Sequence, residues 1–277
     1  MVTAVYYDEK LEDVGMEFLR KGEVKKALGE TEKLDYLTVG QWLLSHGKGD
    51  VLVFLQDVLP YTAFNSSYID FFSLNNNLGK FLSNGGTVVW VGDVPFFYRL
   101  RCEQVNKAEV EEKFKEGLKF VTPKEFFLSK FKIREVEGYG VCFRDIISNW
   151  HFDEGHNLRF ISLFTKYLGF FDISKVCYLD REVNVEPTLT GELLNYRSRK
   201  SFRPVKLSVE YTPLNVTNLL TPSCSGKYTG SWIRKVGKGY FVRLLDYSPS
   251  AEEIKDAIKV GERIASVITE PPGEIPQ

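Results

Sequence analysis

Two stretches of this chain decide its fold: Asp50-Val51-Leu52-Val53-Phe54-Leu55-Gln56-Asp57 and, further along, Asn84-Gly85-Gly86-Thr87-Val88-Val89-Trp90-Val91-Gly92-Asp93. Each is a short apolar run that ends in polar residues, which is typical of a strand buried on both faces in a parallel sheet. Between them, apolar residues recur at about helical period over residues 67–82. A glycine just past a last helical turn can adopt a left-handed conformation and end the helix. The two stretches therefore predict a parallel strand, helix, strand unit.

The same alternation of strands and helices extends along the chain. The predicted strands are residues 3–7, 34–39, 51–55, 87–91, 141–147, 175–179 and 205–211, with a β-hairpin over 230–245. The predicted helices are residues 67–82, 108–118, 158–168 and 251–268, the last of which follows a capping box of Ser250 and Glu253. This alternation favours an α/β fold with a mostly parallel, doubly wound sheet and helices on both faces.

Composition excludes several classes of function. The chain has 277 residues, of which 43% are hydrophobic and 26% charged, as in one large α/β domain or two modest ones. Its formal net charge of −1 creates no field that would attract nucleic acid or an anionic membrane. The N-terminus lacks signal-peptide character, and no stretch reaches the roughly 18 apolar residues that span a bilayer. We therefore expect a cytoplasmic protein without nucleic-acid or membrane partners.

The four cysteines, Cys102, Cys142, Cys177 and Cys224, lie far apart and form no Cys-x-x-Cys pair. This spacing indicates neither a zinc site nor a thioredoxin-type motif, and no cofactor is predicted. Buried thiols are the simplest interpretation, because cysteine pairing inside cells is mainly a property of hyperthermophiles. Scarce glutamine beside abundant lysine and glutamate is itself typical of a thermophilic source.

The sequence resembles the class I glutamine amidotransferase-like superfamily. The resemblance lies in residues 50–55, in residues 81–93 with their Asn-Gly-Gly element, and in residues 234–244 with a Gly-Lys-Gly hairpin before the last helix. It is closest to the non-catalytic branch, which includes β-galactosidase trimerisation domains and ThuA-like proteins. It implies a flavodoxin-like single domain over residues 1–270, with 120–221 as an elaboration or inserted subdomain and 271–277 as a disordered tail.

The catalytic triad of that superfamily has no counterpart here. Active members carry a nucleophilic cysteine on the turn after the mid-domain strand, where this chain has Asp93, and a histidine and glutamate close to the C-terminus. None of the three histidines lies beyond His156. The resemblance thus implies a non-catalytic domain that acts in ligand binding or protein assembly, and it makes glutaminase activity unexpected.

The best candidate ligand site is the edge of the sheet where the predicted parallel strands end. Asp8, Gln56, Asp57, Gly92 and Asp93 all come just after such strands. Open α/β sheets bind ligands at this edge, and carboxylates there can hold a sugar or a metal or act as acid and base. Aspartates at these positions can instead cap the helices that follow.

Two other groups of residues are candidate sites. The run His151-Phe152-Asp153-Glu154-Gly155-His156 holds two imidazoles and two carboxylates, which are possible metal ligands, although it also reads as a polar loop. Arg197, Arg199 and Arg203 form the one dense basic run, which could bind an anion, a nucleotide or an acidic partner, or be an exposed loop. The alternative function is therefore a carbohydrate-active or metal-dependent hydrolase that uses the strand-end carboxylates or His151 and His156.

Self-association is the expected form of protein assembly, because the resemblance includes a trimerising branch. Phe96-Phe97-Tyr98 is an aromatic run that could form such a contact, or could instead pack in the core. A sugar or nucleotide is the expected small-molecule ligand.

Overall fold

The structure of the protein is a computed structural model. It describes residues 1–16, 19–29, 31–63, 76–117, 131–146, 149–152, 158–161, 173–177, 179–221 and 224–269. The predicted tail over 271–277 and most of the predicted helix over 67–82 lie outside these residues. Within these residues we find no helix that combines the length and the hydrophobicity of a membrane-spanning segment.

The main sheet is mixed and mostly parallel. Five strands run parallel, in the spatial order β2 (Glu32–Leu34), β1 (Thr3–Tyr6), β3 (Val51–Phe54), β5 (Thr87–Val91) and β20 (Gly239–Leu244). Antiparallel pairing then adds β19 (Trp232–Val236) and β16 (Thr212–Pro213) at the edge beside β20. The strands predicted over 3–7, 51–55 and 87–91 are thus confirmed, as is the hairpin of β19 and β20.

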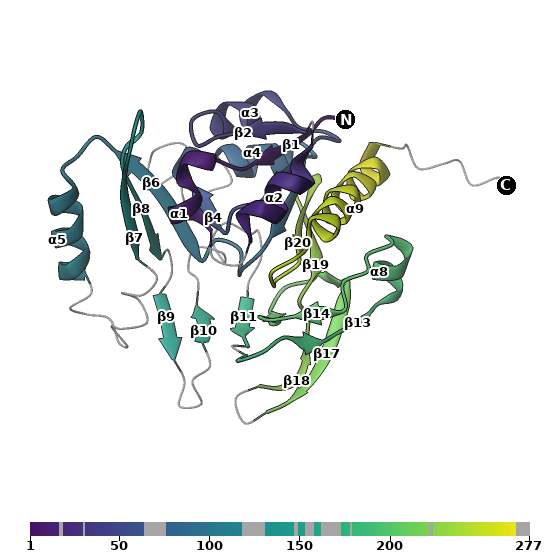
Figure 1. The fold of residues 1–277 in the computed structure, drawn as a ribbon. Coiled ribbons are helices and arrows are strands. Elements are labelled where there is room, and N and C mark those ends of the chain that lie inside the picture. The colour runs from purple at the N-terminus through teal and green to yellow at the C-terminus, as the bar shows by residue number, and fades with distance from the viewer. Residues whose placement is uncertain are drawn as a thin grey trace.

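Helices cover both faces of this sheet. α2 (Lys21–Leu28) and α9 (Ala251–Thr269) share one hydrophobic core with Val51 and Val53 of β3. Figure 1 shows these two helices next to the strands β1, β2, β19 and β20 of the main sheet. α3 (Val39–Ser45) and α4 (Asn77–Ser83) share the other core with Leu52 and Phe54. Because successive side chains of a strand point to opposite faces, a strand between two helical layers must be apolar throughout. This explains the uninterrupted apolar runs of the sequence.

Glycines close the turns that set the order of strands. Gly85 follows α4 with a φ of 93°, and its N–H donates to the carbonyl of Leu82. Gly237, with a φ of 60°, occupies the tight turn between β19 and β20. Both conformations are left-handed and favour glycine, so the predicted helix end and hairpin turn are confirmed. The capping box is also confirmed, since Ser250 N–H donates to Glu253 Oε2 at 2.8 Å.

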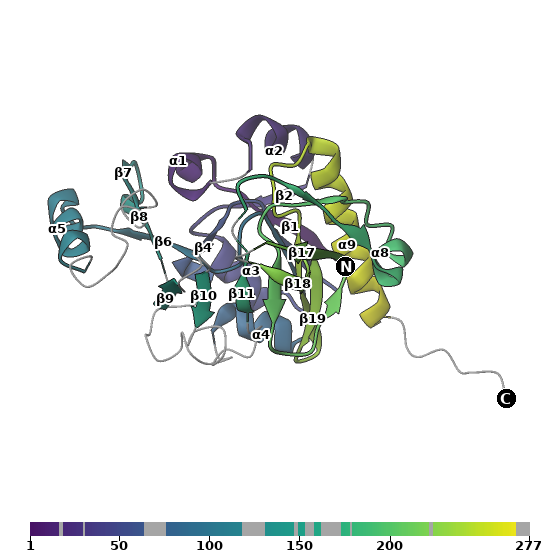
Figure 2. The same cartoon turned by 90° about the horizontal axis from the view of Figure 1, so that it is seen from below.

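A second sheet lies beside the first. Its strands follow the order β4 (Val58–Pro60), β6 (Tyr98–Glu103), β8 (Gly140–Ile146) and β7 (Lys132–Val136). Between β6 and β7 the chain forms α5 (Lys107–Gly117), which Figures 1 and 2 both show at the opposite end of the molecule from α9. A disulfide joins Cys102 of β6 to Cys142 of β8, which face each other across the two strands.

Shorter elements complete the described chain. A third sheet has the order β15 (Val205–Leu207), β11 (Ile173–Val176), β10 (Leu158–Ile161) and β9 (Asn149–Phe152). β12 (Val183–Asn184) pairs with β14 (Lys200–Ser201), and β17 (Asn215–Leu220) lies between β13 (Glu186–Pro187) and β18 (Ser225–Tyr228). The short helices are η1 (Glu9–Leu11), α1 (Glu12–Gly15), η2 (Tyr61–Ala63) and α8 (Leu189–Leu193).

Three sequence-based expectations are wrong. The second strand, expected over 34–39, lies instead at Glu32–Leu34 as β2, and the residues after it form a turn and the start of α3. Asp35 Oδ1 fixes this turn because it accepts the N–H groups of Leu37 and Thr38. Residues 158–161, expected to be helical, form β10, which pairs with β9. The cysteines are not free thiols, since Cys177 also pairs with Cys224.

The aromatic run Phe96-Phe97-Tyr98 is buried. It belongs to the core on the α3 and α4 side of the main sheet, where Phe96 packs edge-on against Trp90. Of the two interpretations of this run, core packing is the one that the structure bears out. Any contact between copies of the chain must therefore use other residues.

Candidate functional site

The carboxyl ends of the central parallel strands bring the predicted edge residues together. Asp8 follows β1 and is 3% exposed, and its two carboxylate oxygens accept the N–H groups of Lys10 and Tyr36, each at 3.0 Å. Gln56 follows β3 and is fully buried, and its side-chain amide forms two hydrogen bonds with the backbone of Asp8. These side chains join two strand ends and the segment after β2.

The turn after β5 is built around a close contact with Asp57. Asp57 Oδ1 accepts the N–H of Asp93 at 2.8 Å, and both aspartates are fully buried. A Cβ added to Gly92 would lie 1.7 Å from Asp57 Oδ1, and the φ of Gly92 is +120°. Only glycine fits there without movement of Asp57 or strain of the backbone. Asp93 Oδ1 accepts the N–H of Val94 at 2.6 Å, which fixes the turn itself.

Asp93 also forms a buried ion pair with Arg203, which the chain places 110 residues away. The side chains of Asp93 and Arg203 are 0% and 7% exposed. Arg203 belongs to the basic run that we expected either to bind an anion or to be an exposed loop, but its side chain is buried and its guanidinium faces inward to the sheet. The pair fastens the segment before β15 to the carboxyl edge of the main sheet.

A second buried acid and base lie next to this pair. Asp246 Oδ2 accepts the hydroxyl of Ser201 at 2.6 Å and the N–H of Arg203 at 2.9 Å, while Arg243 Nη1 donates to the carbonyl of Arg203 at 3.0 Å. Burial raises the pKa of Asp246, against the opposing effect of Arg243. Burial likewise lowers the pKa of Arg243, although Asp246 and Asp93 act in the opposite direction. We call Asp57, Asp93, Arg203, Arg243 and Asp246 the strand-end network.

Two residues of this network, Arg243 and Asp246, are not among those predicted from the sequence. Asp246 follows β20 just as Asp8 follows β1, so the rule that selected the other strand ends would also have selected it. Arg243 has a weaker signal, which is a charged residue in the middle of a predicted apolar strand. A charge in such a position needs a buried partner.

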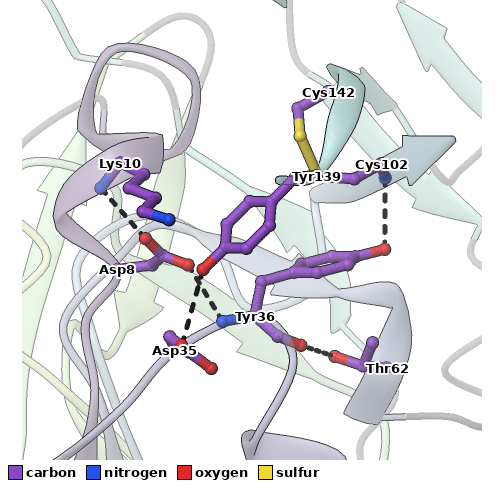
Figure 3. The surroundings of a disulfide bond; sticks show 8 residues. All are labelled: Asp8, Lys10, Asp35, Tyr36, Thr62, Cys102, Tyr139 and Cys142. Atoms are coloured by element: carbon purple, nitrogen blue, oxygen red, sulfur yellow. Dashed lines mark hydrogen bonds between the residues drawn. A yellow bond between two sulfur atoms is a disulfide. The ribbon is translucent and has the colours of Figure 1, made fainter. Parts of the chain in front are cut away.

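A cluster of tyrosines lies on the other side of Asp8, close to the Cys102–Cys142 disulfide (Figure 3). The N–H of Cys102 donates to the hydroxyl oxygen of Tyr36 at 3.1 Å, and the Tyr139 hydroxyl points to Asp35. Burial raises the pKa of Tyr36, and burial with the nearby charge of Asp8 raises that of Tyr6. These phenols therefore stay neutral over the physiological pH range.

Two of the three predicted basic residues do lie on the surface. Arg197 and Arg199 are exposed and line a hollow of about 400 Å³ together with Tyr196. Arg197 Nε donates to Asn195 Oδ1 at 3.1 Å, and both side chains are accessible to a solvent anion, in contrast to that of Arg203. Ligand binding at this surface, and at the strand-end edge, stays a prediction.

The histidine candidates are not brought into a described metal site. His151 belongs to β9, and His156 lies outside the described residues. Among the residues that the structure describes, no group of three histidine, cysteine, aspartate or glutamate side chains is arranged to hold a metal ion. A site that includes His156 stays a prediction.

Comparison with known proteins identifies one family. No curated protein matches the chain. The model of the MJECL34 family matches residues 4–143, which is half of the chain and includes four of the five parallel strands, β1, β2, β3 and β5. The matched region contains Asp8, Gln56, Asp57, Gly92 and Asp93, while the arginines of the strand-end network lie outside it. The chain belongs to the MJECL34 family.

Proposed function

We propose that this chain is a non-catalytic α/β domain of the flavodoxin-like, class I glutamine amidotransferase-like type, and that it acts in protein assembly or ligand binding. The order β2, β1, β3, β5, β20 supports this fold type, because flavodoxin-like sheets have the spatial order 2-1-3-4-5. The helices on both faces and the glycine-closed hairpin before α9 support it as well.

The burial of Asp93 is the observation that carries the non-catalytic part of the proposal. A nucleophile or general base must reach its substrate directly or through one water molecule. Asp93 occupies the turn where catalytic relatives carry their nucleophile, yet it is fully buried and paired with Arg203. Its carboxylate has a structural use instead, since it holds the segment before β15 against the sheet.

Release of glutamate and ammonia from glutamine tests this part of the proposal. The full chain is expected to give no release above that of buffer. Turnover that disappears in an Asp93→Asn variant, while an Arg199→Met variant keeps it, would overturn the proposal. Arg199 is the matched control because it belongs to the same basic run but is exposed.

Light scattering tests the assembly role. A single oligomeric mass that stays constant over a wide range of protein concentration is expected. A monomer at every concentration would count against assembly and leave ligand binding as the function. That second role is supported by Arg197 and Arg199 on their shared hollow, where two guanidinium groups can hold a phosphate or carboxylate. If the chain binds a ligand there, the purified protein is expected to retain a nucleotide, and an Arg197→Met, Arg199→Met double variant is expected to lose it.

A further inference from the structure

The two disulfides of this chain differ in their access to solvent. Cys177 and Cys224 are 0% and 1% exposed and belong to a small hydrophobic cluster with Leu219 and Tyr228. Cys142 is also 0% exposed. Cys102 is only partly buried, so it is the single half-cystine that the described part of the chain leaves open to solvent.

Cys102 lies at the side of a surface groove. The groove has a volume of about 530 Å³ and runs between α3 and η2, where it is lined by Tyr36, Leu37, Gln41, Leu44 and Tyr61 besides Cys102. This volume is in the range of about 300–1,000 Å³ found for sites that hold small molecules. The hydrogen bond from Cys102 N–H to the Tyr36 hydroxyl oxygen fixes the backbone of Cys102 at the groove (Figure 3).

We propose that the Cys102–Cys142 disulfide is a redox site for low-molecular-weight thiols and that Cys102 is the sulfur they attack. Thiol–disulfide exchange depends on which sulfur the attacking thiolate can reach. The groove gives a small thiol a route to Cys102, whereas Cys142 is enclosed between β6 and β7. The redox chemistry of this disulfide is independent of the function proposed above.

The reaction balances with the thiol as the reductant. A thiolate RS⁻ forms a bond to Cys102 Sγ, the Cys102–Cys142 bond breaks, and Cys142 leaves with the electron pair and takes a proton from solvent. The product is a mixed disulfide at Cys102. A second thiol can then displace Cys102, so that two thiols are oxidised to RSSR and one protein disulfide is reduced to two thiols.

The enclosed disulfide provides an internal comparison. Attack on Cys177 or Cys224 requires a local opening of their cluster, and such openings are rare in a packed core. A thiol should therefore reduce Cys102–Cys142 faster than Cys177–Cys224, by a factor on the order of ten or more. The two disulfides lie in one molecule, so protein concentration and thiol reactivity are the same for both.

The test is native-state reduction of the full chain with β-mercaptoethanol, followed by alkylation and mass spectrometry of each cysteine. The expected result is a mixed disulfide at Cys102 and labelling of Cys142, with Cys177 and Cys224 still joined and the circular dichroism spectrum unchanged. Three results would overturn the proposal: equal or faster reduction of Cys177–Cys224, a mixed disulfide on Cys142 instead, or no reduction of either disulfide before the protein unfolds.

Variants that narrow the groove test the route of attack. Leu44 is 47% exposed, so Leu44→Trp should fold and should slow reduction of Cys102–Cys142 several-fold by steric exclusion. Gln41→Trp is a second blocking variant on the same helix. Leu193→Trp is the matched control, since Leu193 is 77% exposed on α8 and is not part of the groove. Unchanged reduction in both blocking variants would show that the thiol does not enter through the groove.

Discussion

Removal of Arg203 is expected to destabilise the protein strongly. Arg203→Met deletes the guanidinium while keeping much of the side-chain volume, and it leaves the Asp93 carboxylate buried without its ion-pair partner, with Arg243 as the remaining charge nearby. Both side chains are at least nine-tenths buried, so solvent screening does not reduce their interaction as it does at a surface. Breaking such a pair from one side typically costs about 3–5 kcal/mol of unfolding free energy.

Equilibrium unfolding in urea, followed by circular dichroism, measures this loss. In a chain of this size each 1 kcal/mol lowers the melting temperature by roughly 2–4 °C, so a fall of about 6–20 °C is expected. Arg199→Met is the control, because an exposed arginine away from such contacts should change the free energy by no more than about 0.5 kcal/mol.

A double-mutant cycle separates the pair from its surroundings. Asp93→Asn should also destabilise, because it leaves Arg203 charged and buried beside a neutral amide. The double variant Asp93→Asn, Arg203→Met should recover part of the loss, with a coupling energy of about 0.5–3 kcal/mol. A cost below about 1 kcal/mol for Arg203→Met, or a coupling energy of zero, would refute the conclusion that this ion pair fastens the segment before β15 to the sheet.

The remaining predictions concern a glycine, a tyrosine and a helix cap. Gly92→Ala should cost at least about 1–3 kcal/mol of unfolding free energy, because it strains the backbone and displaces Asp57. The control Gly22→Ala lies in open space on α2 and should stabilise the protein by about 0.5–1 kcal/mol. Equal effects of the two substitutions in urea unfolding would contradict this prediction. Burial raises the pKa of Tyr196 from 10.0 to about 12. The protonated Tyr196 hydroxyl therefore contributes its full stabilisation below pH 10, and this stabilisation is lost as the pH rises from 10 to 12. Tyr196→Phe should weaken the pH dependence of the unfolding free energy in that window. An unaltered pH dependence would show that other groups cause it. Ser250→Ala should cost about 0.5–2 kcal/mol by removing the cap of α9, and a melting temperature equal to that of the unaltered chain would argue against the cap.

Local signals in the sequence were sufficient for the sheet interior. β1, β3 and β5 are short apolar runs whose ends coincide with Asp, Asn-Gly-Gly or Gly-Asp residues, and burial on both faces leaves such runs no other stable arrangement. The sequence-based prediction extends the second strand past Leu34, where β2 ends, because Tyr36, Leu37 and Val39 continue its apolar character. There the side-chain hydrogen bonds of Asp35 prevail over hydrophobic pattern.

The candidate site depended on contacts that no local pattern encodes. The positions of Asp8, Asp57 and Asp93 followed from the strand ends, but the ion pair that compensates the buried charge of Asp93 needs Arg203, which joins it from far along the chain. The two disulfides also depend on long-range contacts. Cys102 and Cys142 are 40 residues apart and meet because β6 pairs with β8. Cys177 and Cys224 are 47 residues apart, and they meet because the end of β11 lies close to the start of β18. Long-range pairing of this kind cannot be read from spacing.

The position of β20 has a consequence for co-translational folding of the chain on the ribosome. β20 is the neighbour of β5 on the side away from β3, and it is synthesised long after β5. Until it arrives, the nascent chain carries an apolar strand with one open row of backbone donors and acceptors, which is the kind of edge through which chains aggregate. The region matched by the family model ends at residue 143 and so lacks β20. A chain truncated at residue 143 is expected to be insoluble. In cells, folding of the full chain is expected to depend on chaperones that shield the β5 edge until β20 has been synthesised.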